Sequence, residues 1–282
     1  MNILFITWNV DPEIFRVGSF AVRWYGLLFA LGFFLGYLIM YKIFRKEKIP
    51  VKTLDELTTY MVIGTVVGAR LGHCFFYEPS YYLHHPIRIF MVWEGGLASH
   101  GAGIAIVLTL WLFSSRKKLP FLWVMDRVVI TVALAGLLIR TGNLMNSEIF
   151  GYSTTLPWGF QFVRAFDPAD AVGPRHPTQL YEGLSYLAIF LFLWWYYYKK
   201  DGKPAPGFIF GMFLVFVFSA RFFIEFLKMP QVKAIEDALK MKTGMNLGQW
   251  LSIPFVLAGI ILMLYSKKIL FRRIKKVEFN DA

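Results

Sequence analysis

Seven apolar stretches of about 20 residues run along this chain and constrain its fold more than any other feature. A helix of that length matches the hydrocarbon thickness of a bilayer and satisfies its own backbone hydrogen bonds in lipid. We therefore expect an all-α polytopic membrane protein with seven transmembrane helices. The stretches cover roughly residues 20–41, 54–76, 97–114, 122–142, 181–198, 206–227 and 247–266.

Composition supports this class. Of the 282 residues, 57% are hydrophobic and only 17% are charged, whereas soluble domains average about 25% charged residues. The net charge of +12 would suggest nucleic-acid binding in a soluble protein, but here it fits cytoplasmic loops near anionic lipids. We expect no nucleic-acid partner. Cys74 is the only cysteine, which excludes an internal disulfide and a paired-cysteine metal site.

Basic residues are concentrated in alternate connections. Residues 42–52, 116–118, 199–203 and 267–276 hold more than half of the 30 lysines and arginines. By the positive-inside rule these segments are cytoplasmic, so we expect the N-terminus outside and the C-terminus in the cytoplasm. The first residues lack a basic leader, and we expect no cleavable signal peptide. The longer, more polar connections then lie outside, which suggests that the protein works at the outer leaflet.

Polar side chains interrupt these apolar stretches. A charge at mid-bilayer costs about 2.5–3.5 kcal/mol on insertion scales, so each one needs a reason. In the expected topology they all fall in the outer half of their helices, where they could form one site. They are Arg23, Tyr25, Arg70, His73, His100, Arg140, Asn143, Arg221 and Glu225.

Several of these residues also have purely structural interpretations. Arg221 and Glu225 are four residues apart and could form an ion pair within one helix. Arg70 could pair with Glu94 or another carboxylate as a packing device. His73 is more typical of a hydrogen-bonded core histidine than of a functional one.

Other polar positions are open to the same interpretation. Arg23 could extend its head group to the membrane interface. The glycines around His100 could permit close helix contact, with the imidazole in a packing hydrogen bond. Arg140, with Asn143 and Glu148, could be structural, although we favour a functional site there.

The chemistry of this set favours a phospholipid headgroup. Arginine presents a planar fork that suits phosphate oxygens, and the amides of Asn143, Asn146 and Gln179 can hydrogen-bond hydroxyls. A phosphate that carries hydroxyls, at the depth of the outer leaflet, describes such a headgroup. The polar cluster that ends the fourth stretch is then a candidate lipid-binding site.

The segment IRTGNLMNSEIFG, residues 139–151, resembles the signature GRxGNFxNxExxG of the bacterial prolipoprotein diacylglyceryl transferases. Six further pieces similar to that family occur in the same order and extend the resemblance over nearly the whole chain. The matching signature residues are Arg140, Gly142, Asn143, Asn146, Glu148 and Gly151. The further pieces are RWYG, GARLGH, WEGGLASHGAG, RHPTQLYE, RFFIEF and LGQWLSIP.

The resemblance implies an activity and a location. Members transfer the diacylglyceryl group of phosphatidylglycerol to the lipobox cysteine of a preprolipoprotein in the bacterial inner membrane. The products are a thioether-linked lipid and glycerol phosphate. It also implies a seven-span bundle treated as one integral membrane domain over 1–282. Within it we expect a periplasmic arm at 1–19, a periplasmic head at 143–180 and a basic cytoplasmic tail at 267–282.

The resemblance also implies roles for individual residues. Arg140, Asn143, Glu148 and Arg221 match family positions needed for activity and lipid binding. We expect Arg140 and Arg221 to clamp the phosphate, with Arg70 as a possible third partner.

The remaining roles concern the headgroup and the proton. Asn143 and Asn146 would bind headgroup hydroxyls, and Glu148 would orient an arginine or the glycerol. His100 matches a histidine proposed as a base in the family; imidazole titrates near neutral pH and could take the thiol proton. Tyr25 matches a functionally important tyrosine.

The chain departs from the family pattern at a few positions. Ile139 replaces a glycine, Leu144 a phenylalanine, and Ala102 interrupts a glycine pair after His100. Some relatives have a tyrosine where this chain has Val217, so a mechanism that needs that tyrosine cannot operate unchanged here.

Two other classes of function remain as alternatives. A transporter or flippase for an anionic lipid or solute would also use intramembrane arginines, although the sequence contains no evident inverted repeat. A non-catalytic lipid-binding scaffold is the second. The sequence contains no P-loop, dinucleotide or HExxH motif, so we expect no cofactor and no metal.

Overall fold

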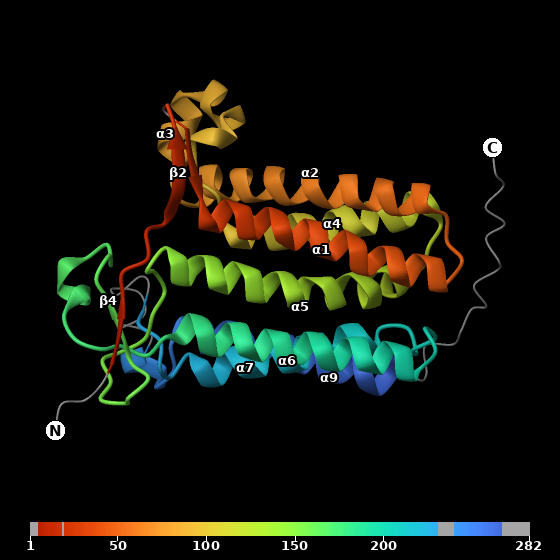
Figure 1. Cartoon of the computed structure of the whole chain (residues 1–282). Coiled ribbons are helices and arrows are strands. Elements are labelled where there is room, and N and C mark those ends of the chain that lie inside the picture. Colours follow the sequence, from red (N-terminus) through yellow and green to blue (C-terminus); the bar gives the residue numbers. More distant parts are fainter. Residues whose placement is uncertain (1–4, 19, 231–239, 267–282) are drawn as a thin grey trace. The chain divides into compact units, whose positions relative to one another are not determined.

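A computed structural model describes residues 5–18, 20–230 and 240–266, and within them each apolar stretch forms a long helix (Figure 1). Three of these helices, α1, α5 and α9, are long and apolar enough to cross a membrane. The length and apolar composition of these three helices are consistent with the α-helical membrane class predicted from the sequence. The seven helices are α1 Trp24–Lys46, α2 Val51–Phe76, α4 Ser99–Lys117, α5 Phe121–Met145, α6 Thr178–Lys199, α7 Phe208–Ile224 and α9 Leu247–Ser266.

The helix ends differ from the apolar windows by a few residues. The first window was predicted to begin at residue 20, but residues 20–23 form a strand and α1 begins at Trp24. At its other end α1 continues to Lys46, with Arg45 and Lys46 in the last turn. Basic side chains interact favourably with the carbonyl end of a helix, so the helix extends beyond its apolar part. The predicted tail, residues 267–282, lies outside the described residues.

Four short strands lie outside the long helices and were not predicted. β1 (Ile6–Trp8) pairs in parallel with β4 (Phe160–Phe162), although about 150 residues separate them. β2 (Glu13–Val17) pairs antiparallel with β3 (Phe20–Arg23). The predicted arm and head segments are therefore joined by a small sheet.

The head segment has its own small apolar core. Its buried members come from the end of α5, the following loop and β4, and Trp8 of the arm packs against them. The indole Nε1 of Trp8 donates a hydrogen bond to the carbonyl oxygen of Leu144, at 2.9 Å. A 3-10 turn, η3 (Pro168–Ala171), completes the segment. The buried core residues are Leu144, Phe150, Phe160 and Phe162.

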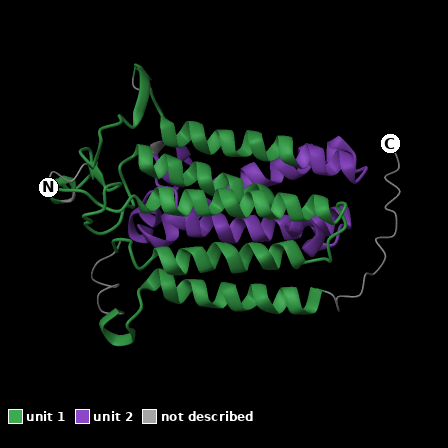
Figure 2. Ribbon diagram, turned by 60° about the horizontal axis from the view of Figure 1, so that its bottom comes forward, with its two compact units in different colours: residues 1–39, 128–270 green, residues 40–127, 271–282 purple. Residues whose placement is uncertain are grey.

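The chain divides into two compact units (Figure 2). The first comprises residues 1–39 and 128–270, and the second comprises residues 40–127 and 271–282. In the first unit α6, α7 and α9 run side by side (Figure 1). Glycines allow the helices to approach closely: a Cβ at Gly211 would lie 2.8 Å from the carbonyl oxygen of Gly259.

Polar side chains lock the start of α9 to the end of α7. The Asn246 Oδ1 accepts from the Gln249 backbone N–H at 3.0 Å, and the Gln249 Oε1 accepts from the Asn246 N–H at 3.1 Å. This reciprocal pair is a capping box. The Asn246 amide also donates to the carbonyl oxygen of Glu225, at 3.2 Å. One cap therefore satisfies donors of α9 and a carbonyl at the end of α7.

The second unit is built on α2 and α4. A Cβ at Gly101 would lie 2.2 Å from the carbonyl oxygen of Gly68, so only glycine fits where these helices cross. After α2 come a short helix and two 3-10 turns. They are α3 (Pro79–His84), η1 (Pro86–Phe90) and η2 (Val92–Glu94).

Candidate functional site

The end of α5 carries a continuous network of polar side chains. Arg140 Nη1 donates to Asn143 Oδ1 at 3.0 Å, and the Asn143 amide donates to Glu148 Oε1 at 2.8 Å. The Asn146 amide donates to the same Glu148 oxygen at 3.1 Å. Arg140 and Asn143 meet because residues three apart share one helix face. The structure thus brings together four of the sequence-predicted site residues.

Glu148 reaches this network from a turn with unusual backbone geometry. Ser147 and Ile149, on either side of it, have φ angles of 53° and 61°. This left-handed region is disfavoured for residues other than glycine, and especially for a β-branched one. Such residues cost about 1–3 kcal/mol each and persist only where the surroundings fix them. The turn aims the Glu148 carboxylate back at α5.

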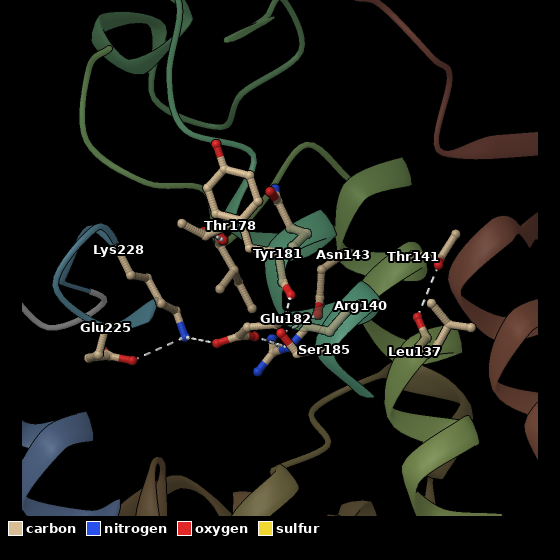
Figure 3. Close-up of polar contacts among 12 residues, drawn as sticks. Leu137, Arg140, Thr141, Asn143, Thr178, Tyr181, Glu182, Ser185, Glu225 and Lys228 are labelled. Atoms are coloured by element: carbon tan, nitrogen blue, oxygen red, sulfur yellow. Dashed lines mark hydrogen bonds and ion pairs between the residues drawn. The ribbon is translucent and has the colours of Figure 1, made fainter. Parts of the chain in front are cut away.

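Arg140 also belongs to a buried row of alternating charges (Figure 3). Its Nε contacts the Glu182 carboxylate from α6. The other Glu182 oxygen lies 3.4 Å from Lys228 Nζ, which in turn lies 3.7 Å from Glu225. Glu182 is 1% exposed and Lys228 is 5% exposed. Each buried charge therefore has an opposite neighbour, which offsets its desolvation.

Two tyrosines complete the surroundings of Arg140. Tyr25 packs on α5 at Gly142, where a Cβ would lie 2.7 Å from the Tyr25 ring. Tyr186 of α6 is buried, and its hydroxyl interacts with Arg140. Arg221 of α7 also interacts electrostatically with Tyr186. Helices α1, α5, α6 and α7 of the first unit thus each contribute a polar side chain to one region.

An ion pair between Arg221 and Glu225, one interpretation of the sequence, stays a prediction. Glu225 forms an ion pair with Lys228, three residues after it, at 3.7 Å. Arg221 is half-buried on α7. Val217, where some relatives have tyrosine, is 9% exposed and supplies no polar group.

Arg70 has a different environment in the second unit. Its guanidinium donates to the carbonyl oxygens of Ile89 at 3.0 Å, Arg88 at 2.5 Å and Gly95 at 2.5 Å. It also stacks over the ring of Tyr82, at 5.0 Å from the centroid. The described partners of Arg70 are therefore backbone carbonyls and an aromatic ring, whereas the structural interpretation of the sequence predicted a carboxylate.

Two histidines of the second unit, His73 and His100, have different surroundings. His73 is partly buried, stacks on Tyr77 and lies 3.8 Å from Glu78. His100 is the second residue of α4, and its side chain is exposed.

Outside the long helices, an ion pair joins the predicted arm to the predicted head. The Asp11 carboxylate accepts from the Glu13 N–H and from Arg164 of the head, at 2.9 Å in both cases. These contacts, first the backbone N–H and then the Arg164 charge, lower the pKa of Asp11. Burial lowers the pKa of His176, which lies just before α6.

The sequence analysis did not assign roles to Glu182, Lys228 and Tyr186. A signal was present for two of them: Glu182 lies at the start of an apolar stretch, and Lys228 follows Glu225 by three residues. Their contacts join segments 40 or more residues apart, however, and helical spacing alone does not predict such contacts.

These features define an α-helical membrane protein with a buried site of charged and amide side chains at the end of α5. The model of the prolipoprotein diacylglyceryl transferase family matches residues 12–265. The chain belongs to this family of enzymes.

Curated relatives agree over nearly their full length. The chain is 53% identical to the phosphatidylglycerol–prolipoprotein diacylglyceryl transferase of Tolumonas auensis, over 93% of this chain and 97% of the relative. It is 48% identical to the enzyme of the same name from Porphyromonas gingivalis, over 94% of this chain and 95% of the relative. For Chloroherpeton thalassium the identity is 46%, with the same coverage.

Proposed function

We propose that this chain transfers the diacylglyceryl group of phosphatidylglycerol to the thiol of a prolipoprotein, at the lipobox cysteine. The observation that carries the proposal is the hydrogen-bonded array of half-buried Arg140, buried Asn143 and half-buried Glu148 in a chain of this family. A guanidinium beside amides suits a phosphate that carries hydroxyls. The reaction takes place in the bacterial inner membrane, which the chain crosses seven times with its N-terminus outside.

The reaction is a substitution at carbon. The thiolate sulfur attacks the glycerol carbon that bears the phosphate, so a carbon–sulfur bond forms as the carbon–oxygen bond breaks. Glycerol phosphate leaves with the electron pair of the broken bond, and the thiol proton passes to a base. A free thiol has a pKa of about 8.5, so a base or a nearby cation increases the thiolate fraction.

We assign Arg140 and Arg221 to the phosphate. Negative charge grows on the bridging oxygen as the bond breaks, and fixed cations in a dry site stabilise it. Glu182 and Asn143 hold the guanidinium of Arg140 at two of its nitrogens, which supports a fixed orientation. Preorganisation of this kind avoids reorganisation during the reaction.

The other site residues have complementary roles in the proposal. Asn143 and Asn146 bind the hydroxyls of the headgroup, and Glu148 orients both amides. His100 takes the thiol proton, and Tyr25 lines the region beside Gly142. For Arg70, its carbonyl partners favour a role in ordering residues 86–96 over direct contact with phosphate.

The test uses the purified full-length protein with phosphatidylglycerol and a synthetic peptide that contains a lipobox cysteine. We expect the peptide mass to increase by one diacylglyceryl group, with release of glycerol phosphate. A matched peptide with serine in place of the cysteine should remain unmodified. Redistribution of lipid between leaflets without a peptide adduct would indicate a flippase instead, and lipid binding alone would indicate a scaffold.

A further inference from the structure

The turn that presents Glu148 has a conformation that its own residues do not favour. Ser147 and Ile149 have positive φ angles of 53° and 61°, and neither is a glycine. A β-branched residue in this region is an outlier, since its Cβ crowds the backbone. The conformation therefore depends on contacts from elsewhere in the chain.

Two consecutive side chains of α6 supply such contacts. The Thr178 hydroxyl donates to the Ile149 carbonyl oxygen at 2.9 Å, and the Gln179 amide donates to the Glu148 carbonyl oxygen at 2.6 Å. Both residues are 1% exposed. The two carbonyl groups are adjacent along the turn, so the pair holds both peptide groups around Ile149.

These hydrogen bonds do not serve the start of α6 itself. Threonine at a helix start commonly caps the helix by accepting from its first N–H groups. Here the N-cap position is Pro177, and no side chain caps the helix. The Thr178 hydroxyl and the Gln179 amide are directed to the turn, 29 and 31 residues earlier in the chain.

The conformation of this turn also fixes the hydrogen-bond network of the candidate site. Glu148 Oε1 accepts from Asn143 at 2.8 Å and from Asn146 at 3.1 Å, and Asn143 accepts from Arg140. A change in the backbone at residues 147–149 would move the carboxylate and release both amides. Arg140 would then lose its partner on α5.

We propose that Thr178 and Gln179 are positioning residues that hold the turn at Ser147–Ile149 and thereby set Glu148, Asn143 and Arg140 for the phospholipid headgroup. They act on the lipid through the turn. The proposal rests on the transferase function proposed above, and it adds that α6 sets the affinity for phosphatidylglycerol.

The first test removes each hydrogen bond with little change in side-chain size. We expect Thr178→Val and Gln179→Met each to raise the KM for phosphatidylglycerol about tenfold, because each leaves a half-buried carbonyl without the donor that holds it. The kcat should change less than about threefold, because Glu182 still holds the guanidinium of Arg140 in both variants. Thr178→Ser keeps the hydroxyl and should restore the wild-type KM.

A matched control separates this effect from general loss of packing. The Thr58 hydroxyl donates to the Leu54 carbonyl oxygen, also at 2.9 Å, but within α2. Thr58→Val should leave the KM for phosphatidylglycerol unchanged. An equal rise in KM for Thr58→Val and Thr178→Val would overturn the proposal.

The second test examines whether the clamp acts through the backbone of the turn. Glycine adopts positive φ without strain, so a turn with Ile149→Gly depends less on its clamp. We expect Ile149→Gly combined with Gln179→Met to recover at least half of the loss in affinity that Gln179→Met causes alone. If both variants bind equally weakly, Gln179 does not act through the turn.

Lipid binding distinguishes failure of this proposal from failure of the proposed function. Native mass spectrometry of the detergent-solubilised protein measures bound phosphatidylglycerol without any turnover. A wild-type protein that binds this lipid but modifies no peptide would refute the transferase function and leave the clamp testable by binding. Equal binding by wild type and both single variants would overturn the clamp.

Discussion

Lys228 Nζ lies 3.4 Å from Glu182 Oε1, and both side chains are almost completely buried. Arg140 contacts the other oxygen of the same carboxylate. One negative charge therefore separates two cations in an environment of low dielectric constant. Removal of one member of a buried ion pair leaves its partner uncompensated, which is more costly than removal of both.

We expect Glu182→Gln to lower the free energy of unfolding by about 3 kcal/mol, because Arg140 and Lys228 lose their shared counter-ion. Thermal denaturation in detergent measures this as a lower midpoint. The double variant Glu182→Gln with Lys228→Met should be more stable than Glu182→Gln alone. If the two losses simply add, Glu182 and Lys228 are not energetically coupled.

Gly142 should not tolerate a side chain. A Cβ there would lie 2.7 Å from the Tyr25 ring and 3.3 Å from its Cα, so Gly142→Ala would force α1 and α5 apart. We expect lower thermal stability and a large loss of transfer activity. Gly26→Ala is the control, since a Cβ at Gly26 meets nothing within 4 Å. Equal effects of the two substitutions would contradict the close approach at Gly142.

Arg140→Lys should reduce kcat/KM for phosphatidylglycerol at least about 100-fold, because lysine keeps the charge but loses the planar fork. Steady-state transfer to a lipobox peptide measures this effect. Full activity of the lysine variant would refute a bidentate clamp on the phosphate. Arg164→Lys, at an exposed pair with Asp11 in the head, serves as the control and should retain activity.

His100→Gln tests the path of the thiol proton. Glutamine is similar in size and can hydrogen-bond, but it cannot accept a proton at neutral pH, so we expect kcat to fall about 100-fold. Raising the pH should recover part of the rate, since more of the peptide thiol then ionises without a base. An unchanged transfer rate near neutral pH would exclude His100 from the proton path.

His176 should make the head sensitive to acid. Burial lowers its pKa in the folded protein below the ordinary value of 6.5. The unfolded chain therefore binds more protons as the pH falls below about 6.5, and the folded state loses stability in that range. His176→Asn should reduce the drop in melting temperature between about pH 7.5 and about pH 5.5. An unchanged drop in the His176→Asn protein would contradict this origin of the acid sensitivity.

Much of the fold could be predicted because bilayer thickness and helix geometry determine the pattern of apolar stretches. The fourth stretch, predicted at 122–142, forms α5, Phe121–Met145. Local spacing likewise placed Arg140 beside Asn143, and the structure contains this hydrogen bond. Contacts within one helix or one turn follow directly from the order of residues.

Contacts between distant segments could not be predicted in this way. Glu182 meets Arg140 only because α6 packs on α5, where Gly183 leaves space beside Leu137 and Arg140. The strands β1 and β4 are three residues long, too short for a periodic signal. The partners of Arg70 could not be predicted either. They are backbone carbonyl groups, which every residue has, so the types of side chain in the sequence do not indicate them.

The pairing of β1 with β4 has a consequence for biogenesis. Ribosomes produce β1 before its partner strand, which emerges only about 150 residues later, after roughly 8–30 s at ordinary rates of translation. During that interval Trp8 has no Leu144 carbonyl to bind. β1 therefore has no partner strand until the chain has been synthesised as far as β4.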